Sequence, residues 1–479
     1  MEAGLFRFLR FSLGLEGEAK GLLDGRKGSF DWDACYQFAK RQTLVGVLFD
    51  GIQRLPKELA PARPLLLRWL SDSESIRRRN MRMDRASAYV YNKVCAAGFR
   101  CCILKGQGNA LLYPHPSSRI PGDVDVWVMA NREELRHIAL SLTEGDGSSL
   151  QESLNHIGLT VHGVSVELHS TPALLNSPLH NSRLQKWLKR NADLQCSNRI
   201  ALPNNAGEVA VPTLSFNIIY QLCHLFHHCF YEGVGLRQIV DYYFVLMNTD
   251  FSGNTDEGAG NTDRDEVLLN TDSTDFADSS SGDFDGDGCF LNTDYTDFTD
   301  RFSGNTDRDE VLLNTDYTDS TDSSSGDFER DGCLLNTDCT DFLDSSSGGL
   351  GEVDSGGALV ALQEELKWLG LGEFAGAVMY VLREVMGLDE KRMICAPDER
   401  RGRLLLEEIM AGGNFGHYDT RNHFGQGALW HNIQRFRRDW RMLRFYPSEA
   451  LSEPLFRAWH FLWRWKQKHT GMPKERNLN

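Results

Sequence analysis

An acidic, repetitive tract interrupts the chain and constrains its fold more than any other feature. Residues 249–349 hold 27 acidic and 4 basic residues, whereas the rest of the 479-residue chain holds 40 acidic and 47 basic ones. The string NTDRDEVLLNTD occurs at 261–272 and again at 305–316, a period of 44. Short apolar strings such as VLL are too few to offset the conformational entropy that ordering the tract would cost. We therefore expect a disordered acidic insertion, with the folded part assembled from the segments on either side.

A calcium-binding loop is the alternative interpretation of this insertion. Five of its residues match positions 1, 3, 5, 6 and 12 of the twelve-residue calcium loop, namely Asp283, Asp285, Asp287, Gly288 and Asp294. The last position is Asp where the loop requires the longer, bidentate Glu, and the flanking Ser, Gly, Thr and Asp residues do not favour helices. The disordered insertion is the better interpretation.

The remainder of the chain has the composition of a globular protein. Hydrophobic residues make up 41% of the sequence, and no run of 18 or more apolar residues predicts a membrane span. Arg7, Arg10 and Glu16 interrupt the apolar start of the chain, unlike a secretory signal, so we expect a cytoplasmic location. The 11 cysteines are scattered and indicate no disulfide framework.

Two aspartates lie one residue apart in a predicted strand. A helical pattern ends at Gly98, a short buried strand ends at Gly106, and a proline-containing loop leads into the strand DVDVWVM. Because side chains alternate along a strand, the valines share one face, while Asp123, Asp125 and Trp127 share the other. Two carboxylates held this close repel each other, unless a divalent cation such as Mg²⁺ binds both. Two solvated acids at a strand edge are the simpler alternative.

A second strand adds a third acid. In HGVSVELHS, residues 162–170, alternation places Ser165, Glu167 and His169 on one face. Two-metal phosphoryl transfer needs such a third carboxylate, because the carboxylates together hold the ions that act on the attacking and leaving oxygens. His169 is either a substrate contact or a support of the metal ligands, and the alternative is a solvated strand histidine.

These motifs resemble a known superfamily. A glycine at the end of a strand, Asp-x-Asp on the next strand and a third acid later are similar to the nucleotidyltransferases that include DNA polymerase beta and the aminoglycoside nucleotidyltransferases. The strings LKG, YP, DVDVWV and VELH, with Arg119 between them, resemble in particular a large, functionally uncharacterised bacterial nucleotidyltransferase family. The resemblance continues into HLFHHCFYEGVGLRQIVDYY and EEIMAGGNFGHYD. It implies an NTP substrate and Mg²⁺ or Mn²⁺ bound by Asp123, Asp125 and Glu167.

The resemblance also implies substrate-binding residues. Lys105 and Gly106 stand where polymerase-type members carry Gly-Ser or Gly-Gly, and a lysine provides a point charge for phosphate. Arg119 is expected to meet the triphosphate, unless it is an ordinary loop arginine. Arg237 lies in the distinctive GVGLRQ string, and its alternative role is a helical i, i+4 ion pair with Asp241.

Two further clusters have simpler interpretations. His224 and His228 have the i, i+4 spacing of a zinc pair, but no third ligand of the metalloprotease kind accompanies them, so we expect them to pack or contact substrate. Basic residues alternate with Trp459, Trp463 and Trp465 near the C-terminus. This pattern occurs in nucleic-acid and membrane contacts, but it more often docks a terminal helix onto its own protein, and DNA binding is not indicated.

Together these features predict an α+β protein with a small mixed-sheet nucleotidyltransferase core and surrounding helices. The expected function is metal-dependent transfer of a nucleoside monophosphate from an NTP to an unidentified small-molecule, protein or RNA acceptor. The alternative is a catalytically inactive nucleotide- or partner-binding module on the same fold. The expected regions are an N-terminal helical region, the catalytic core, a helical substrate-contact region, the acidic insertion and a C-terminal helical region, at 1–74, 75–200, 201–248, 249–349 and 350–479.

Overall fold

The folded part of the chain brings together segments from both sides of the acidic tract. The computed structural model describes residues 2–17, 30–143, 150–250, 355–419, 421 and 428–469, all within one compact unit. The expected disorder and the calcium-type spacing fall on 251–349, outside the described residues. Thr249 is buried and donates its hydroxyl to the Val245 carbonyl at 2.7 Å, so the folded part extends past the expected boundary at 249.

The described strands form a mixed five-stranded sheet and a separate two-stranded sheet. The larger sheet has the order β1-β2-β5-β4-β3, and β2 runs parallel to β5 while the other neighbours are antiparallel. This mixed sheet among helices confirms the predicted α+β class. The strands are β1 (Cys101–Leu104), β2 (Val124–Val128), β3 (Gln151–Glu152), β4 (His156–Val161), β5 (Val164–His169), β6 (Arg199–Leu202) and β7 (Gly207–Ala210).

Helices account for most of the remaining described residues. Those before the acidic tract are α1 (Glu2–Ser12), α2 (Trp32–Arg41), α3 (Val45–Gln53), α4 (Arg63–Ala96), α5 (Gly106–Ala110), α6 (Arg132–Leu142), α7 (Pro178–Ser197), α8 (Leu214–Tyr231) and α9 (Leu236–Asn248). Those after it are α11 (Ser355–Trp368), α12 (Gly372–Met386), α13 (Glu399–Gly412), α14 (Ala428–Leu443) and α15 (Pro447–His469). Short 3₁₀ turns are η1 (Lys57–Leu59), η2 (Pro116–Ser118), η5 (Glu390–Arg392) and η6 (Asn414–Gly416).

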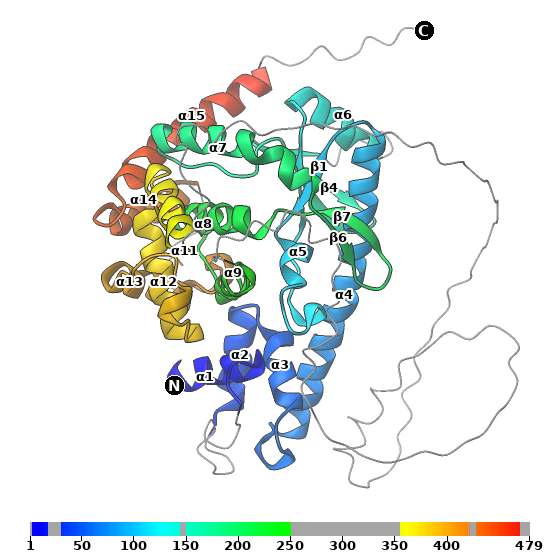
Figure 1. Ribbon diagram of the computed structural model, residues 1–479, viewed down its shortest axis with the longest axis vertical. Coiled ribbons are helices and arrows are strands. Elements are labelled where there is room, and N and C mark those ends of the chain that lie inside the picture. Colours follow the sequence, from blue (N-terminus) through cyan, green and yellow to red (C-terminus); the bar gives the residue numbers. More distant parts are fainter. Residues whose placement is uncertain are drawn as a thin grey trace, which may run out of the picture. The chain divides into compact units, whose positions relative to one another are not determined.

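Helix α4 supports the sheet and the loop that leads into β2. It begins with a proline in its first turn, where the missing N–H costs no helical hydrogen bond. The helix runs alongside the sheets and contacts β1, β2 and β7 (Figure 1). Buried Asn80 donates to the carbonyls of Ser117 at 2.9 Å and Arg119 at 2.8 Å. These bonds fix the loop just before the predicted aspartates.

Strand β2 is buried on both faces. All five of its residues are buried, as is typical of a strand with a parallel neighbour in a covered sheet. Trp127, on the same face as Asp125, stacks on Phe216 of α8 at 5.9 Å between ring centroids. The face that carries Asp125 is therefore covered by helix α8.

The helices after the acidic tract complete the core formed before it. Helix α12 is apolar around most of its circumference, contacts α1, α8 and α9, and packs extensively on α13. Phe374 of α12 lies 4.7 Å from Phe226 of α8 between ring centroids. The acidic tract thus interrupts a single core in the sequence.

The C-terminal helices differ from the expectation of a docked tryptophan cluster. Trp440 of α14 and Trp459 of α15 expose 67% and 51% of their surface, so the prediction that the terminal tryptophans dock on the protein is wrong for Trp459. The side chains of Trp463 and Trp465 lie outside those that the structure describes. Among the described helices, none combines the length and the apolarity that crossing a lipid bilayer requires.

Candidate active site

The strand register brings the three predicted carboxylates together. Asp125 of β2 lies opposite Glu167 of β5 in the parallel ladder, and Asp123 immediately precedes β2. The carboxylate oxygens of Asp123, Asp125 and Glu167 lie within 4.8 Å of one another, close enough to share a metal ion. Hard oxygen donors of this kind suit Mg²⁺ or Mn²⁺.

Asp125 lies at the centre of the group and already has two partners. One of its carboxylate oxygens is 3.0 Å from Lys105 Nζ, and the other is 2.9 Å from His169 Nε2. Burial raises the pKa of Asp125, but the charge of Lys105 and the hydrogen bond from His169 outweigh it, so that the pKa lies below its ordinary value. Asp125 is therefore ionised and firmly held.

Asp123 and Glu167 have different surroundings. The negative charge of Asp125, followed by burial, raises the pKa of Asp123 above its ordinary value. Glu167 lies 3.3 Å from His169 Nε2 and 3.6 Å from His156 Nε2. Burial raises the pKa of Glu167, but the hydrogen bond from His169 and the charges of His156 and His169 together outweigh it, and the net shift is downward. Repulsion between carboxylates is thus concentrated at Asp123.

Lys105 and Gly106 form the turn between β1 and α5. Lys105 has a positive φ of 51°, a rare conformation for a residue with a side chain, and its ammonium is 3.4 Å from His224 Nε2. Gly106 also has a positive φ, and a Cβ there would lie 3.7 Å from the Asp123 carbonyl oxygen. The turn therefore points the buried Lys105 ammonium at Asp125 and holds the Gly106 backbone close to Asp123.

Arg119 and Arg237 are both buried, but they have different partners. Arg119 makes two hydrogen bonds of 2.7 Å to the two carboxylate oxygens of Asp241, and the Tyr113 hydroxyl donates to the same carboxylate at 2.7 Å. Arg237 donates to the Ile120 carbonyl at 2.7 Å. The ion pair of Asp241 is therefore made with Arg119 from the preceding loop, instead of the helical i, i+4 pair with Arg237.

A line of histidines leads away from the carboxylates. The Nε2 atoms of His224 and His228 lie 3.0 Å apart, and His228 Nδ1 is 3.3 Å from a carboxylate oxygen of Glu232. Burial, followed by the charge of Lys105, places the pKa of His224 well below its ordinary value, so this ring is neutral. The predicted packing or substrate contact is compatible with this position, whereas the described ligand groups do not include the zinc pair.

One pocket of about 400 Å³ collects these residues. Its wall contains every residue that the sequence predicted for the active site: Lys105, Gly106, Arg119, Asp123, Asp125, Glu167, His169 and Arg237. It also contains residues that sequence reasoning missed or left without a role, among them Asn155, His156, His227, Glu232 and Phe415. The sequence alone could not place His156 opposite His169, because that requires knowing that β4 pairs with β5. The sequence signal that could have pointed to Phe415 was its place among glycines in GGNFG, part of a string that resembles the family.

Among the comparisons with known proteins, the match to a family model agrees with these motifs. Residues 28–259 match the model of a family described as an uncharacterised nucleotidyltransferase. The crystal structure of an antigenic nucleotidyltransferase-like protein from Paracoccidioides brasiliensis matches with 16% identity and a TM-score of 0.24, over 34% of this chain and 75% of that one. No curated protein shows significant similarity to the chain. The matched segment, residues 28–259, includes all eight predicted site residues and is similar in sequence to this uncharacterised nucleotidyltransferase family.

Proposed function

We propose that this chain is a divalent-metal-dependent nucleotidyltransferase, which moves a nucleoside monophosphate from an NTP to an acceptor and releases pyrophosphate. The observation that carries the proposal is the group of three carboxylates within 4.8 Å of one another on the wall of a pocket. Bound Mg²⁺ or Mn²⁺ would supply the positive charge that polarises phosphoryl oxygens. A cytoplasmic location is part of this proposal.

The proposed roles follow from the surroundings of each residue. Asp123, Asp125 and Glu167 hold the metal, and Glu167, which is less buried than Asp125, also orients the acceptor. The acceptor nucleophile forms a bond to the α-phosphorus as the bond to the pyrophosphate oxygen breaks, and Glu167 accepts the proton that the nucleophile loses. A negatively charged group of three acids also keeps phosphate away until positive charge is present, which makes the binding of NTP dependent on metal.

The remaining predicted residues contact the triphosphate or position those that do. Lys105, the Gly106 backbone and His169 lie around the carboxylates and are assigned to the phosphates, together with Arg237, which also lines the pocket. Arg119 is assigned a positioning role, because both oxygens of Asp241 bind its guanidinium. This assignment changes the sequence-based expectation that Arg119 meets the triphosphate.

A direct experiment tests the activity. Full-length protein is incubated with each labelled NTP, Mg²⁺ and a cell extract, and the labelled product identifies the acceptor as a small molecule, a protein or an RNA. We expect the label to appear with wild type and with Glu365→Gln, a carboxylate that pairs with Arg190 outside the pocket, and to be absent with Asp123→Asn or after chelation of the metal. Labelling that persists in Asp123→Asn would contradict the proposed role of the carboxylates.

One observation favours the alternative of an inactive binding module. Lys105 and His169 occupy both oxygens of Asp125, so the protein itself neutralises part of the acidic group. A module of this kind would bind NTP equally well with and without divalent metal and would give no labelled product. The proposed enzyme requires the metal both to bind NTP and to form the labelled product. Measuring NTP binding with and without a chelator therefore separates the two functions.

A further inference from the structure

The pocket has a second end, away from the carboxylates, that the proposed function leaves unexplained. Phe415 lies there, in the turn η6 between α13 and α14, beyond the residues that match the family model. We propose that the Phe415 ring is the platform on which the base of the NTP stacks. This inference rests on the proposed function and adds to it the residue that recognises the planar part of the substrate.

The backbone of Phe415 is held in an unfavourable conformation. Its φ is 51° and its ψ is 29°, inside a turn where Gly413 and Gly416 also have positive φ. A residue with a bulky side chain rarely adopts such angles, and the cost is on the order of 1–3 kcal/mol. Strain of this kind persists only where the surroundings impose it, and it is concentrated at ligand sites.

Glycine contacts between two loops impose this conformation. A Cβ on Gly416 would lie 2.1 Å from the Glu232 carbonyl oxygen, and a Cβ on Gly233 would lie 3.0 Å from the Gly416 nitrogen. A Cβ on Gly235 would likewise lie 3.0 Å from Asn414 Cα. The string EGVG and the string GGNFG therefore pack backbone against backbone, which explains physically why both carry glycines.

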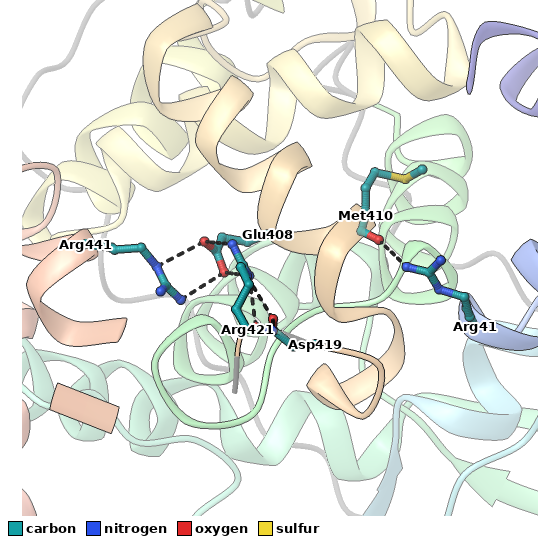
Figure 2. A network of polar contacts seen from close by, with 6 residues as sticks. All are labelled: Arg41, Glu408, Met410, Asp419, Arg421 and Arg441. Atoms are coloured by element: carbon teal, nitrogen blue, oxygen red, sulfur yellow. Dashed lines mark hydrogen bonds and ion pairs between the residues drawn. The ribbon is translucent and has the colours of Figure 1, made fainter. Parts of the chain in front are cut away.

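Polar contacts hold the chain on both sides of the turn (Figure 2). Before it, Arg41 donates to the Met410 carbonyl at 2.9 Å. After it, Arg421 binds Asp419 at 2.8 Å and Glu408 at 2.7 Å. The turn that carries Phe415 is thus fixed at its entry, at its exit and along its backbone, and it presents a positioned ring to the pocket.

The ring lies beside His228, at the far end of a chain of side-chain contacts that begins at Asp125. Its centroid lies 5.1 Å from that of His228, and the side chain is half-buried. His228 is paired with Glu232, whose negative charge repels a triphosphate. The contacts from His228 through His224 and Lys105 to Asp125 link this end directly to the carboxylates. A substrate with its phosphates at Asp125 would therefore place its planar group at Phe415, where stacking stabilises it.

Two ligands separate this platform from the phosphate site. Each is titrated into full-length protein with Mg²⁺: an NTP, which has phosphates and a base, and inorganic tripolyphosphate, which has phosphates alone. We expect wild type to bind the best of the four NTPs more tightly than tripolyphosphate. Phe415→Ala should weaken the binding of that NTP roughly 10-fold, in the range that stacking contributes per base, and leave tripolyphosphate binding unchanged. Phe415→Tyr should retain the wild-type preference.

A matched control lies in the same loop. Tyr418 is an exposed aromatic residue three positions after Phe415 and does not line the pocket, so Tyr418→Ala should bind both ligands as wild type does. Equal weakening of both ligands in Phe415→Ala would mean that the residue only supports the fold, and this would overturn the platform. Unchanged NTP binding would overturn it as well. If wild type bound neither ligand with Mg²⁺, the proposed function itself would fail, a result distinct from the other two.

Discussion

Two networks of charged side chains in this protein are built in opposite ways. Around Glu408, each acid meets an arginine: Arg421 bridges Glu408 and Asp419, and Arg441 Nε lies 3.2 Å from Glu408 (Figure 2). Around Asp125, three carboxylates converge on a pocket, and the nearby cation Lys105 binds the central one. The first network balances its charges internally, whereas the second retains an excess of negative charge.

The pKa shifts express the same difference. Burial raises the pKa of Asp419, but the hydrogen bonds from Arg421 outweigh it, and the net shift is downward. The pKa of Asp123 is raised, first by the charge of Asp125 and then by burial. Close carboxylates by themselves therefore do not indicate a metal site. Uncompensated carboxylates facing a cavity do, because an external cation is then the missing partner.

The largest expected effect is on catalysis, in Asp123→Asn. Removing one metal-binding charge should reduce nucleotidyl transfer by about 100-fold or more. The free energy of unfolding without metal should not fall, because the substitution also removes repulsion from Asp125. Asp419→Asn, in the balanced network, should reduce the rate far less, because Arg421 keeps its ion pair with Glu408. A similar loss of rate in both variants would mean that the two networks do not differ in function.

The next effect is on stability, in Asp125→Asn. This substitution leaves Lys105 and His169 buried without their common carboxylate, and breaking such a buried pair costs about 3–5 kcal/mol. Chemical denaturation should show this loss, and the double variant Asp125→Asn/Lys105→Met should recover part of it. Stability equal to wild type in the single variant would show that Lys105 does not depend on Asp125.

This second prediction departs from what the sequence alone indicated. Alternation in DVDVWV correctly placed Asp125 on the face opposite the valines, and the simpler alternative there was a solvated acid at a strand edge, whereas Asp125 is buried. Alternation says nothing about what covers that face, and α8 reaches it only through tertiary packing. The same limit applies to Arg119, whose partner Asp241 is distant in sequence. Periodicity determines direction along a strand, whereas burial and pairing depend on contacts between segments.

The fold and the site were predictable to different degrees. The class and the convergence of Asp123, Asp125 and Glu167 followed from strand patterns and from the resemblance to a family. The Phe415 end of the pocket did not, because its geometry arises from the glycine contacts between loops on either side of the acidic tract. Strain at Phe415 is a property of φ and ψ, which a sequence string does not reveal.

The gain in unfolding free energy on binding NTP and Mg²⁺ should differ by about 2–3 kcal/mol between variants of the two networks. An NTP with Mg²⁺ at 100 times its dissociation constant stabilises a folded protein by about 2.7 kcal/mol. We expect this increment in wild type, most of it in Glu408→Gln, where Arg421 keeps its ion pair with Asp419, and little of it in Asp123→Asn or with NTP and a chelator. Thermal denaturation measures each case. Equal stabilisation of wild type and Asp123→Asn would place the nucleotide elsewhere than at these carboxylates.

A smaller effect is expected when the balanced network loses one acid. Glu408→Gln removes the partner of Arg421 and Arg441, whose side chains are 39% and 31% exposed. Because water screens these guanidinium groups, the loss should be about 1 kcal/mol. Chemical denaturation without metal should show this loss of unfolding free energy in Glu408→Gln and no loss in Asp123→Asn. A gain of stability in Glu408→Gln would show that this network also carries excess negative charge.

The smallest effect is expected from the acidic tract, where negative charge is densest in the sequence. Deleting one 44-residue period, 261–304, shortens the connection between α9 and α11 by less than half. If the tract contributes no packing, only the entropy of loop closure changes, by about 0.5 kcal/mol in favour of the folded state. Transfer activity and metal-dependent stabilisation should remain at wild-type levels. Aggregation, or loss of a cooperative unfolding transition, would show that the repeats contribute structure, and that acids in this tract need partners as those of the Glu408 network do.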